Sequence, residues 1–505
     1  MESAGGYRAV ELRAFGEAVA HFRELVSRLD RLNRRVDAAR VRERLGNALI
    51  SAGQFAPAMR ALETAETLYR DTNSIEGLAR VFIQQGQVFG LRGKAPEGLS
   101  YLLPQVEQLE RQGLSAAGQA ALLVALGHLL TACSRTRELL SVSERAIQLA
   151  REAGDARLEG RATMRRGIAL AALARLDEAS EAFDLAVGVS ERTGDLWNLS
   201  ISLSNQAHIF SRRGELDRAR RRIEEARASA ERFGGVSMIV LRWCESGQIA
   251  FQIGEWREAR KDLERALGLL GAPEENWTTA YAQACLGELS AIEGQTNEAR
   301  SLLERAIRFT ERSGDLQILR HAQRVAAELD LVEGRAALAC ARLEPLYDDA
   351  SEQEADVIEL LPVLALSKHA LRDDARAIAL AERSIALARA ASMQRALSDG
   401  LRARAYVAAQ ARDWSIASSA LAEALNLDRS MRAPYGEAKT RYGLGLLSAE
   451  RGAADVAREH FTAALANLER LGEGLYANHV RNALAMLDAG DVTMTVPHSA
   501  RERRA

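Results

Sequence analysis

Small and apolar residues recur along the chain at a nearly constant interval of 40 residues. A small residue stands five positions after a glycine-containing turn at Ala58, Gly98, Ala219, Ala259, Ala299, Ala339 and Ala457. Ala179 and Ala377 hold the same position after turns in which the glycine is replaced. A second small residue lies twelve positions before most of these anchors, as Gly167 does before Ala179, and an apolar residue such as Phe183 follows four positions after the anchor. This spacing predicts a chain built from one repeated structural unit.

Two small residues on either side of a tight turn allow two helix backbones to approach closely, and the larger apolar residues fill the remaining space. Each unit therefore reads as helix A, a glycine turn and helix B. We count about twelve units, of which the first is incomplete, with its helix B near residues 16–35. The last unit has helix A near 435–450 and helix B near 454–471, and residues 476–487 read as a closing helix.

The dipeptide Gly-Asp marks the end of several units, at residues 154–155, 194–195 and 314–315. Glycine tolerates the left-handed conformation that commonly ends a helix. Aspartate is a favoured N-cap because its carboxylate accepts hydrogen bonds from the first free backbone N–H groups. The dipeptide is therefore predicted to end one helix and to start the next.

The pattern resembles the tetratricopeptide repeat family over roughly residues 10–490. That family has Gly or Ala at the eighth position of its motif and Ala at the twentieth, which Gly247 with Ala259 and Gly287 with Ala299 reproduce. Units of 40 residues instead of about 34 are similar to the variant in kinesin light chains and in the C-terminal sensor regions of bacterial multidomain signalling ATPases and kinases. Residues 41–81 look most like the latter group. The resemblance implies an all-α, right-handed superhelical solenoid.

One irregularity divides the predicted array. The step from Ala339 to Ala377 is 38 residues, and Pro345 and Pro362 fall within this unit. We expect an N-terminal array over residues 1–344, an irregular repeat with a bend over 345–376, a C-terminal array over 377–488 and a disordered tail over 489–505. Ordinary drift between repeats is the alternative to a bend.

The composition indicates which partners the protein is not expected to bind. The net charge of −2 over 505 residues exerts no overall pull toward nucleic acid or a membrane surface. The N-terminus lacks the pattern of a signal peptide, and the sequence has no apolar run of 18 residues, the length that would indicate a membrane span. Four cysteines without paired spacing suit a reducing compartment. We therefore expect a cytoplasmic protein, and the composition leaves its oligomeric state open.

No catalytic spacing is present. The chain contains neither a phosphate-binding GxxxxGK[ST] loop nor HExxH, GxSxG or GxGxxG motifs. Its acidic pairs fall on predicted helix surfaces or turns, where solvated charge is their ordinary role. We therefore expect no enzyme activity, no metal site and no cofactor.

The family resemblance implies that certain positions of helix A face a concave groove. These positions hold ten candidate residues for binding a partner: Arg40, Arg44, Asn47, Arg80, Gln84, Gln87, Arg161, Arg165, Asn205 and His208. Like charges four residues apart, as in Arg40 with Arg44, destabilise a helix by about 0.2–0.5 kcal/mol. A carboxylate or phosphate of a partner would relieve that cost. The alternative is solvated arginine paired with neighbouring Glu43 and Glu159.

These observations predict a scaffold or sensor module that binds a partner protein or peptide, possibly through an acidic segment, in bacterial signalling. Two alternatives stay open. The chain could be a regulator that closes around a peptide or metabolite, or a separately encoded regulatory part of a signalling ATPase or kinase.

Overall fold

The computed structural model describes residues 4–234, 236–270, 276–348 and 351–489, which contain helices and no strand. The helices are α1 (Ala4–Arg31), α2 (Arg35–Ser51), α3 (Phe55–Asp71), α4 (Ile75–Leu91), α5 (Ala95–Arg111), α6 (Ala116–Ala132), α7 (Thr136–Glu152), α8 (Ala156–Ala172), α9 (Leu176–Thr193), α10 (Leu196–Arg212), α11 (Leu216–Phe233), α12 (Val236–Ile253), α13 (Trp256–Leu270), α14 (Trp277–Ile292), α15 (Thr296–Ser313), α16 (Leu316–Val332), α17 (Ala336–Leu343), the 3₁₀ helix η1 (Glu344–Leu346), α18 (Ala355–Ala370), α19 (Asp374–Ala390), α20 (Gln394–Gln410), α21 (Trp414–Ser430), α22 (Pro434–Glu450), α23 (Ala454–Leu471) and α24 (Tyr476–Asp488).

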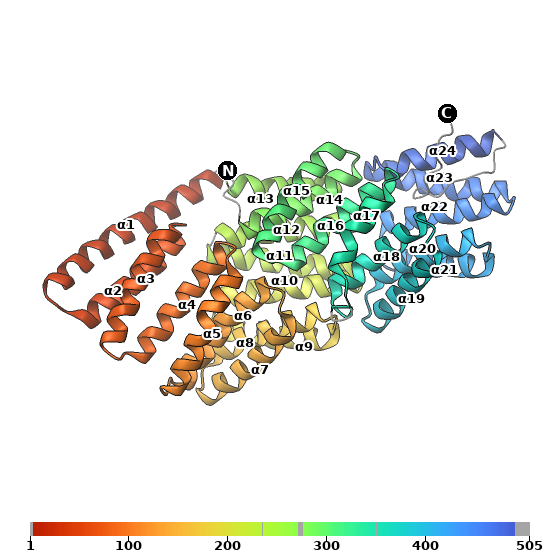
Figure 1. Ribbon diagram of the computed structural model, residues 1–505. Coiled ribbons are helices and arrows are strands. Elements are labelled where there is room, and N and C mark those ends of the chain that lie inside the picture. The colour runs from red at the N-terminus through yellow and green to blue at the C-terminus, as the bar shows by residue number, and fades with distance from the viewer. Residues whose placement is uncertain (1–3, 235, 271–275, 349–350, 490–505) are drawn as a thin grey trace.

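Even-numbered helices are the A helices of the repeat, and odd-numbered helices are the B helices. Each A helix packs against the B helix that follows it, and successive A helices also contact one another. The B helices pack mainly on the A helices before and after them. The result is an all-α solenoid of eleven complete pairs, preceded by α1 and closed by α24, which confirms the predicted repeat. Figure 1 shows the helices following one another along an elongated body.

The small residues predicted to bring helices A and B together do so. A Cβ atom added to Gly167 would lie 2.7 Å from Cε1 of Phe183, and one added to Gly445 would lie 2.4 Å from Cε1 of Phe461. Both phenylalanines are fully buried. Because an atom at such a distance would overlap the ring, each glycine is needed for the close approach of its pair.

The turns follow the predicted chemistry. Gly194 has φ +66° after α9, and Asp195 accepts a hydrogen bond from the backbone N–H of Asn198 at the start of α10. Asp155 and Asp315 cap α8 and α16 in the same way. Where the glycine is replaced, another residue takes the left-handed conformation, as Arg372 does with φ +65°.

The structure departs from the predicted elements in two places. Helix α1 begins at Ala4, well before residue 16, and ends at Arg31. Helix α17 is only eight residues long and is followed by η1, and the next helix, α18, begins at Ala355 and contains Pro362. A continuous hydrophobic cluster nevertheless joins α16 and α17 to α18 and α19. The division into two arrays stays a prediction, and residues 490–505 of the expected tail lie outside the described residues.

The solenoid winds so tightly that its successive superhelical turns touch. The backbone N–H of Leu316 donates to Oγ of Ser134 across 182 residues, and that of Gly474 donates to the carbonyl of Ile292. Arg432 pairs with Asp217 across 215 residues. With units of 40 residues, these separations correspond to about five units for each superhelical turn.

These contacts use the glycine turns between helices A and B. A Cβ atom on Gly214 would lie 2.3 Å from Cγ of Met431, whereas one on Gly53 would meet nothing within 4 Å. Both glycines have positive φ. Gly214 therefore serves two purposes, since it allows the turn and leaves room for the next superhelical turn.

Candidate functional site

The candidate residues lie on the A helices, which contact one another along the array and, at α8 and α10, contact A helices of the next superhelical turn. We call the side formed by the A helices the inner surface. Arg40, Arg44 and Asn47 on α2 and Gln87 on α4 are exposed. The side chains of these four residues make no hydrogen bond or ion pair within the described part of the chain.

The neighbouring candidates on α4 are already engaged or enclosed. Nε of Arg80 pairs with Glu43 at 2.8 Å, and Glu43 also accepts a hydrogen bond from the hydroxyl of Tyr69. This pairing raises the pKa of Arg80, because the hydrogen bond to Glu43 outweighs burial. Gln84 is half-buried, and its Oε1 atom has no hydrogen-bond partner. Glu43 therefore neutralises a different arginine from those expected, Arg40 and Arg44.

Farther along, polar residues at the ninth position of the repeat motif link the A helices α10, α12, α14 and α16 to one another in turn. The hydroxyl of Tyr281 donates to Gln248 at 2.6 Å, and Arg324 donates to Glu288 at 2.8 Å. His208 lies 3.6 Å from Glu245. His208, Gln248 and Glu288 thus hold neighbouring units together, whereas Asn47 and Gln87, at the same repeat position, do not.

Two of the predicted residues in the central units are satisfied within the fold. Nε of Arg161 lies 2.8 Å from Oδ2 of Asp195, and its guanidinium lies 5.5 Å from the ring centre of Trp197. The side chain of Asn205 donates to the carbonyl of Ile201 in its own helix. Both side chains therefore have structural partners.

Arg165 on α8 is different, because its positive charge is buried without a carboxylate. The residue is 6% exposed, its Nε makes no hydrogen bond, and one terminal nitrogen lies 3.3 Å from Nδ1 of His128. Burial and the nearby charge of Arg161 lower the pKa of Arg165 to about 10. Burial, with Arg165 beside it, lowers the pKa of His128 to about 3. At neutral pH this pair therefore carries an unbalanced positive charge.

The inner surface is bridged next to this pair. One hydrophobic cluster contains Met164 on α8, Ile209 on α10, and Ala355 and Ile358 on α18. Helices α8 and α10 contact α18 and α20 respectively. The inner surface, whose candidate side chains are exposed at α2, is thus covered at α8 and α10 where the solenoid has returned upon itself.

Charged residues reinforce this bridge. Arg212 on α10 lies 2.9 Å from Asp356 and 3.2 Å from Glu359 on α18. Burial raises the pKa of Asp356 to about 6, which Arg212 offsets only in part. For Glu359 burial is outweighed by Arg212 and by Arg395, and the pKa falls to about 2. Nothing in the repeat pattern signalled these partners, because they are 144 and 147 residues apart.

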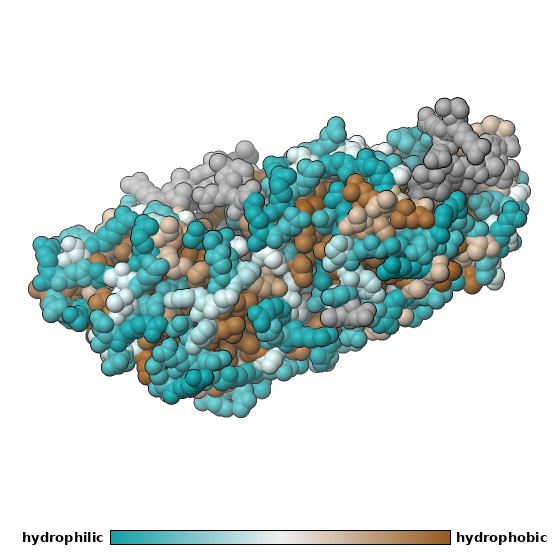
Figure 2. Space-filling view, viewed as in Figure 1, coloured by the Kyte–Doolittle hydropathy of each residue, from teal (hydrophilic) through white to brown (hydrophobic). Residues whose placement is uncertain are grey.

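Within the described residues, no three His, Cys, Asp or Glu side chains are grouped so that they could hold a metal ion. No helix in the same part of the chain is long and apolar enough to cross a membrane. The face shown in Figure 2 is mostly hydrophilic, with hydrophobic residues in narrow strips and small patches. Recognition on this face would therefore rely on polar contacts.

Comparisons with known proteins support the fold. No known family's sequence model matches the chain, and no curated protein sequence matches it. Among solved structures, a Rap protein complexed with competence and sporulation factor is similar, with a TM-score of 0.54 and 14% identity over 71% of this chain and 99% of that one. The apo form of RapI has a TM-score of 0.43 and 12% identity over 54% of this chain and 98% of that one.

The apo form of the quorum sensor NprR from B. thuringiensis gives a TM-score of 0.45 and 15% identity over 71% of this chain and 99% of that one. At these identities the likeness concerns the fold alone. The eighth-position glycines that pack on buried phenylalanines, Gly167 on Phe183 and Gly445 on Phe461, and the likeness to the Rap protein show an all-α solenoid that is similar in fold to tetratricopeptide-type repeats.

Proposed function

We propose that the protein is a non-catalytic binding module that holds a segment of a partner protein, or a peptide, against its inner surface. The observation that supports this most directly is the buried guanidinium of Arg165, which no described carboxylate neutralises. An acidic group of the partner would supply the missing charge.

The energetic argument rests on burial. An unpaired buried charge costs several kcal/mol, and hydrogen bonding to an anion recovers much of that cost. Arginine suits this role because its planar guanidinium can donate two parallel hydrogen bonds to a carboxylate or phosphate. Burial keeps His128 neutral at physiological pH, so the charge of the pair is that of Arg165 alone, which favours an anion as the ligand.

The open N-terminal units offer a route of approach. Arg40 and Arg44 are exposed and unpaired within the described part, and the amides of Asn47 and Gln87 can both donate and accept hydrogen bonds. An extended acidic segment would lie along α2 and α4 and reach Arg165 on α8. Since Arg161 and Asn205 have partners inside the fold, we assign them to positioning and not to contact.

The similar Rap protein was solved in complex with competence and sporulation factor, which supports binding as the use of this fold. A second candidate function, a peptide- or metabolite-sensing regulator, is favoured by the contact of α10 with α18 through Arg212. A ligand on the inner surface would alter that bridge and thereby the shape of the solenoid. We place either activity in cytoplasmic bacterial signalling.

The test uses two neighbouring arginines on α8. Arg165→Met removes the buried charge and keeps an aliphatic side chain. Arg166→Met removes a neighbouring arginine that lies 3.7 Å from Glu144 on α7. Partners captured by the wild-type protein from a cell extract would be quantified on both variants by mass spectrometry, with circular dichroism as a check of folding. We expect a specific partner to be lost by Arg165→Met and retained by Arg166→Met.

Equal recovery of every partner on both folded variants would contradict the role of Arg165. Hydrogen exchange with an isolated peptide separates the two candidate functions. A sensor would show changed protection in α10 and α18, and a scaffold would show protection only where the peptide binds.

A further inference from the structure

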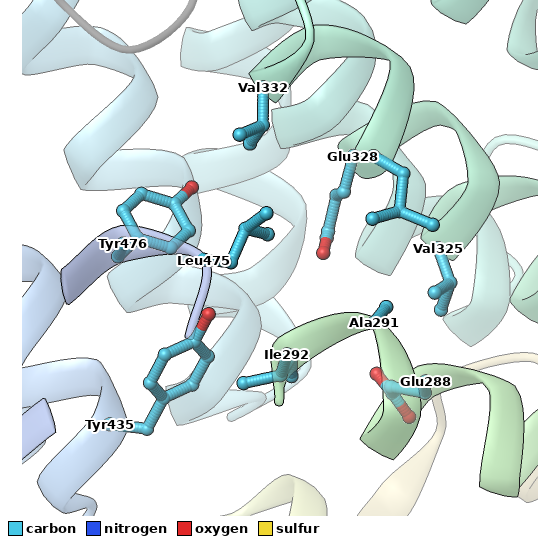
Figure 3. Close-up of a pocket in the computed structure, with 10 residues that line it drawn as sticks. Glu288, Ala291, Ile292, Val325, Glu328, Val332, Tyr435, Leu475 and Tyr476 are labelled. Atoms are coloured by element: carbon cyan, nitrogen blue, oxygen red, sulfur yellow. The ribbon is translucent and has the colours of Figure 1, made fainter. Parts of the chain in front are cut away.

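A small pocket forms where the C-terminal end of the solenoid meets its middle. Its walls come from α14, α16, α22 and the first turn of α24, and Figure 3 shows the side chains that line it. The backbone N–H of Gly474 donates to the carbonyl of Ile292 beside the pocket. The pocket therefore exists only because two superhelical turns are in contact.

The pocket combines aliphatic walls with four polar side chains. Ile292, Val325, Val332 and Leu475 are among the aliphatic residues, and Glu288, Glu328, Tyr435 and Tyr476 supply the oxygens. Its enclosed volume of about 10 Å³ is enough for one group the size of a water molecule. A ligand head group of that size would fill it.

Several of these oxygens are not used by the fold. Arg324 donates to one oxygen of Glu288 and to one oxygen of Glu328, both at 2.8 Å. The second oxygen of Glu328 accepts no hydrogen bond from any described residue, and neither do the hydroxyls of Tyr435 and Tyr476. The pocket thus contains oxygen atoms that accept no hydrogen bond from the described residues and could accept one from a ligand.

The electrostatic balance around the pocket is negative. A third carboxylate, Glu473, is buried next to it and accepts three backbone N–H groups at the start of α24 without a basic partner. Burial raises the pKa of Tyr435 and of Tyr476 well above the usual value, and the charges of Glu328 and Glu473 raise both further. Three carboxylates therefore lie at this place, and two of them share the guanidinium of Arg324.

The other cations near the pocket are occupied. Nζ of Lys439 lies 4.8 Å from the ring centre of Tyr435 and 3.5 Å from Asp399, with which it pairs. Arg402, whose charge acts on both tyrosines, pairs with Asp399 and Asp428, and Arg395, whose charge acts on Glu288, lies 3.5 Å from Glu359. Burial lowers the pKa of His321, which is 3.3 Å from Glu288, so this ring is neutral at physiological pH. None of these groups cancels the negative charge of the pocket.

We propose that this pocket binds a primary ammonium group. An ammonium head is about the size of water, carries one positive charge and has three N–H donors, which match the free carboxylate oxygen and the two hydroxyls. The faces of tyrosine rings attract cations as well. The group would come from a free aliphatic amine, from a lysine side chain or from the N-terminus of a peptide.

This inference does not depend on the anion site at Arg165, since it uses different helices and the opposite charge. The pocket joins α14 and α16 to α22 and α24. An ammonium group bound there would link two superhelical turns and would stabilise the closed form of the solenoid.

The probe is n-butylammonium, with 1-butanol as the uncharged control, and binding to the full chain is measured by titration calorimetry. Saturable binding of butylammonium and none of butanol are expected. Glu328→Gln should weaken butylammonium at least about five-fold, because it removes one of the charges that attract the ligand. Tyr476→Phe, which keeps the ring, should weaken it less.

One control variant and two further probes keep the test specific. Glu304→Gln on α15 removes an exposed carboxylate, 3.9 Å from Arg308, and should leave the affinity unchanged. Nα-acetyl-lysine methylamide and glycine methylamide identify whether a lysine side chain or a peptide N-terminus is accepted. Equal binding of butanol and butylammonium, or unaltered affinity in folded Glu328→Gln, would overturn the proposal.

Discussion

Helices α2 and α8 carry arginine at the same two repeat positions, but the side chains of these arginines have different surroundings. Arg40 and Arg44 on α2 are exposed to solvent, whereas Arg161 on α8 pairs with Asp195 and Arg165 is buried. The difference arises beyond the unit itself. Helix α18 returns over α8, while no described helix covers α2 in this way.

The comparison shows that repeat position fixes which way a side chain points but not what it meets. In an open solenoid each unit contacts only its neighbours. Here side chains at the same repeat position change from exposed on α2 to buried on α8 within a few units. The same arginine column is therefore a solvated surface at one end and a charged site in the middle.

The largest loss of stability is expected from Arg212→Ala, which removes the ion pairs between α10 and α18. The change leaves the buried carboxylates of Asp356 and Glu359 without their main partner, and breaking such a pair costs about 3–5 kcal/mol. Thermal unfolding followed by circular dichroism measures the loss. Arg432→Ala is the matched control, because the Arg432–Asp217 pair also joins superhelical turns but is exposed and should contribute about 0–1 kcal/mol. Similar losses for the two variants would contradict the bridge.

The next effect concerns the contact between superhelical turns. Gly214→Ala and Gly53→Ala both place a side chain at positive φ, which costs about 1–2 kcal/mol in either case. Only Gly214→Ala also drives a methyl group into Met431, which adds about 1–3 kcal/mol. The difference between the melting temperatures of the two variants measures the contribution of the contact between superhelical turns. Equal melting temperatures would contradict that contribution.

A smaller effect is expected in the dependence of stability on pH. The native pKa of Asp356, about 6, lies above the unfolded value of about 3.9. Its contribution to stability is therefore fully present below about pH 4 and is lost as the pH rises through 6. Glu359 behaves in the opposite way, since its pKa is lowered to about 2. Its contribution is present above about pH 4.3 and is lost as the pH falls toward 2.

Only Asp356 of this pair titrates between pH 5 and 7. Asp356→Asn should remove a pH-dependent term on the order of 1–2 kcal/mol. The measurement is the change in melting temperature from pH 5 to pH 7 in the wild type and in the variant. Histidines titrate equally in both proteins, so identical changes would show that Asp356 is not responsible.

The smallest effect compares the two arginines at the same repeat position. Arg165→Met relieves a buried unpaired charge and should stabilise the fold by about 1–2 kcal/mol. Arg44→Met removes a solvated charge four residues from Arg40 and should change stability by less than about 0.5 kcal/mol. Chemical denaturation of both variants measures this. Equal changes would mean that the closure of the solenoid does not set the environment of Arg165.

Local features of this fold could be predicted from sequence because they depend on residues close together in the chain. Helix α23 begins at Ala454 and ends at Leu471, as its turn residues predict. The contact of Gly167 with Phe183 follows from a spacing of sixteen residues. Each depends on one turn and two helices.

The closure of the solenoid could not be predicted in that way. It results from small rotations between units that add up over about five units, and no single spacing in the sequence records their sum. The pairing of Arg212 with Asp356 and the pocket between α16 and α24 depend on it. For the same reason, the predicted groove residues could be placed on the A helices but not assigned as open or buried.

The stacking of turns at Gly214 and Met431, and of Gly294 on Gly474, limits how this chain can change in evolution. Open repeat arrays gain or lose units by duplication and deletion, because each unit needs only its neighbours. Here one unit more or fewer in the middle would shift every glycine turn away from its partner about five units later. The number of repeats should therefore vary at the ends of the chain and stay constant between them.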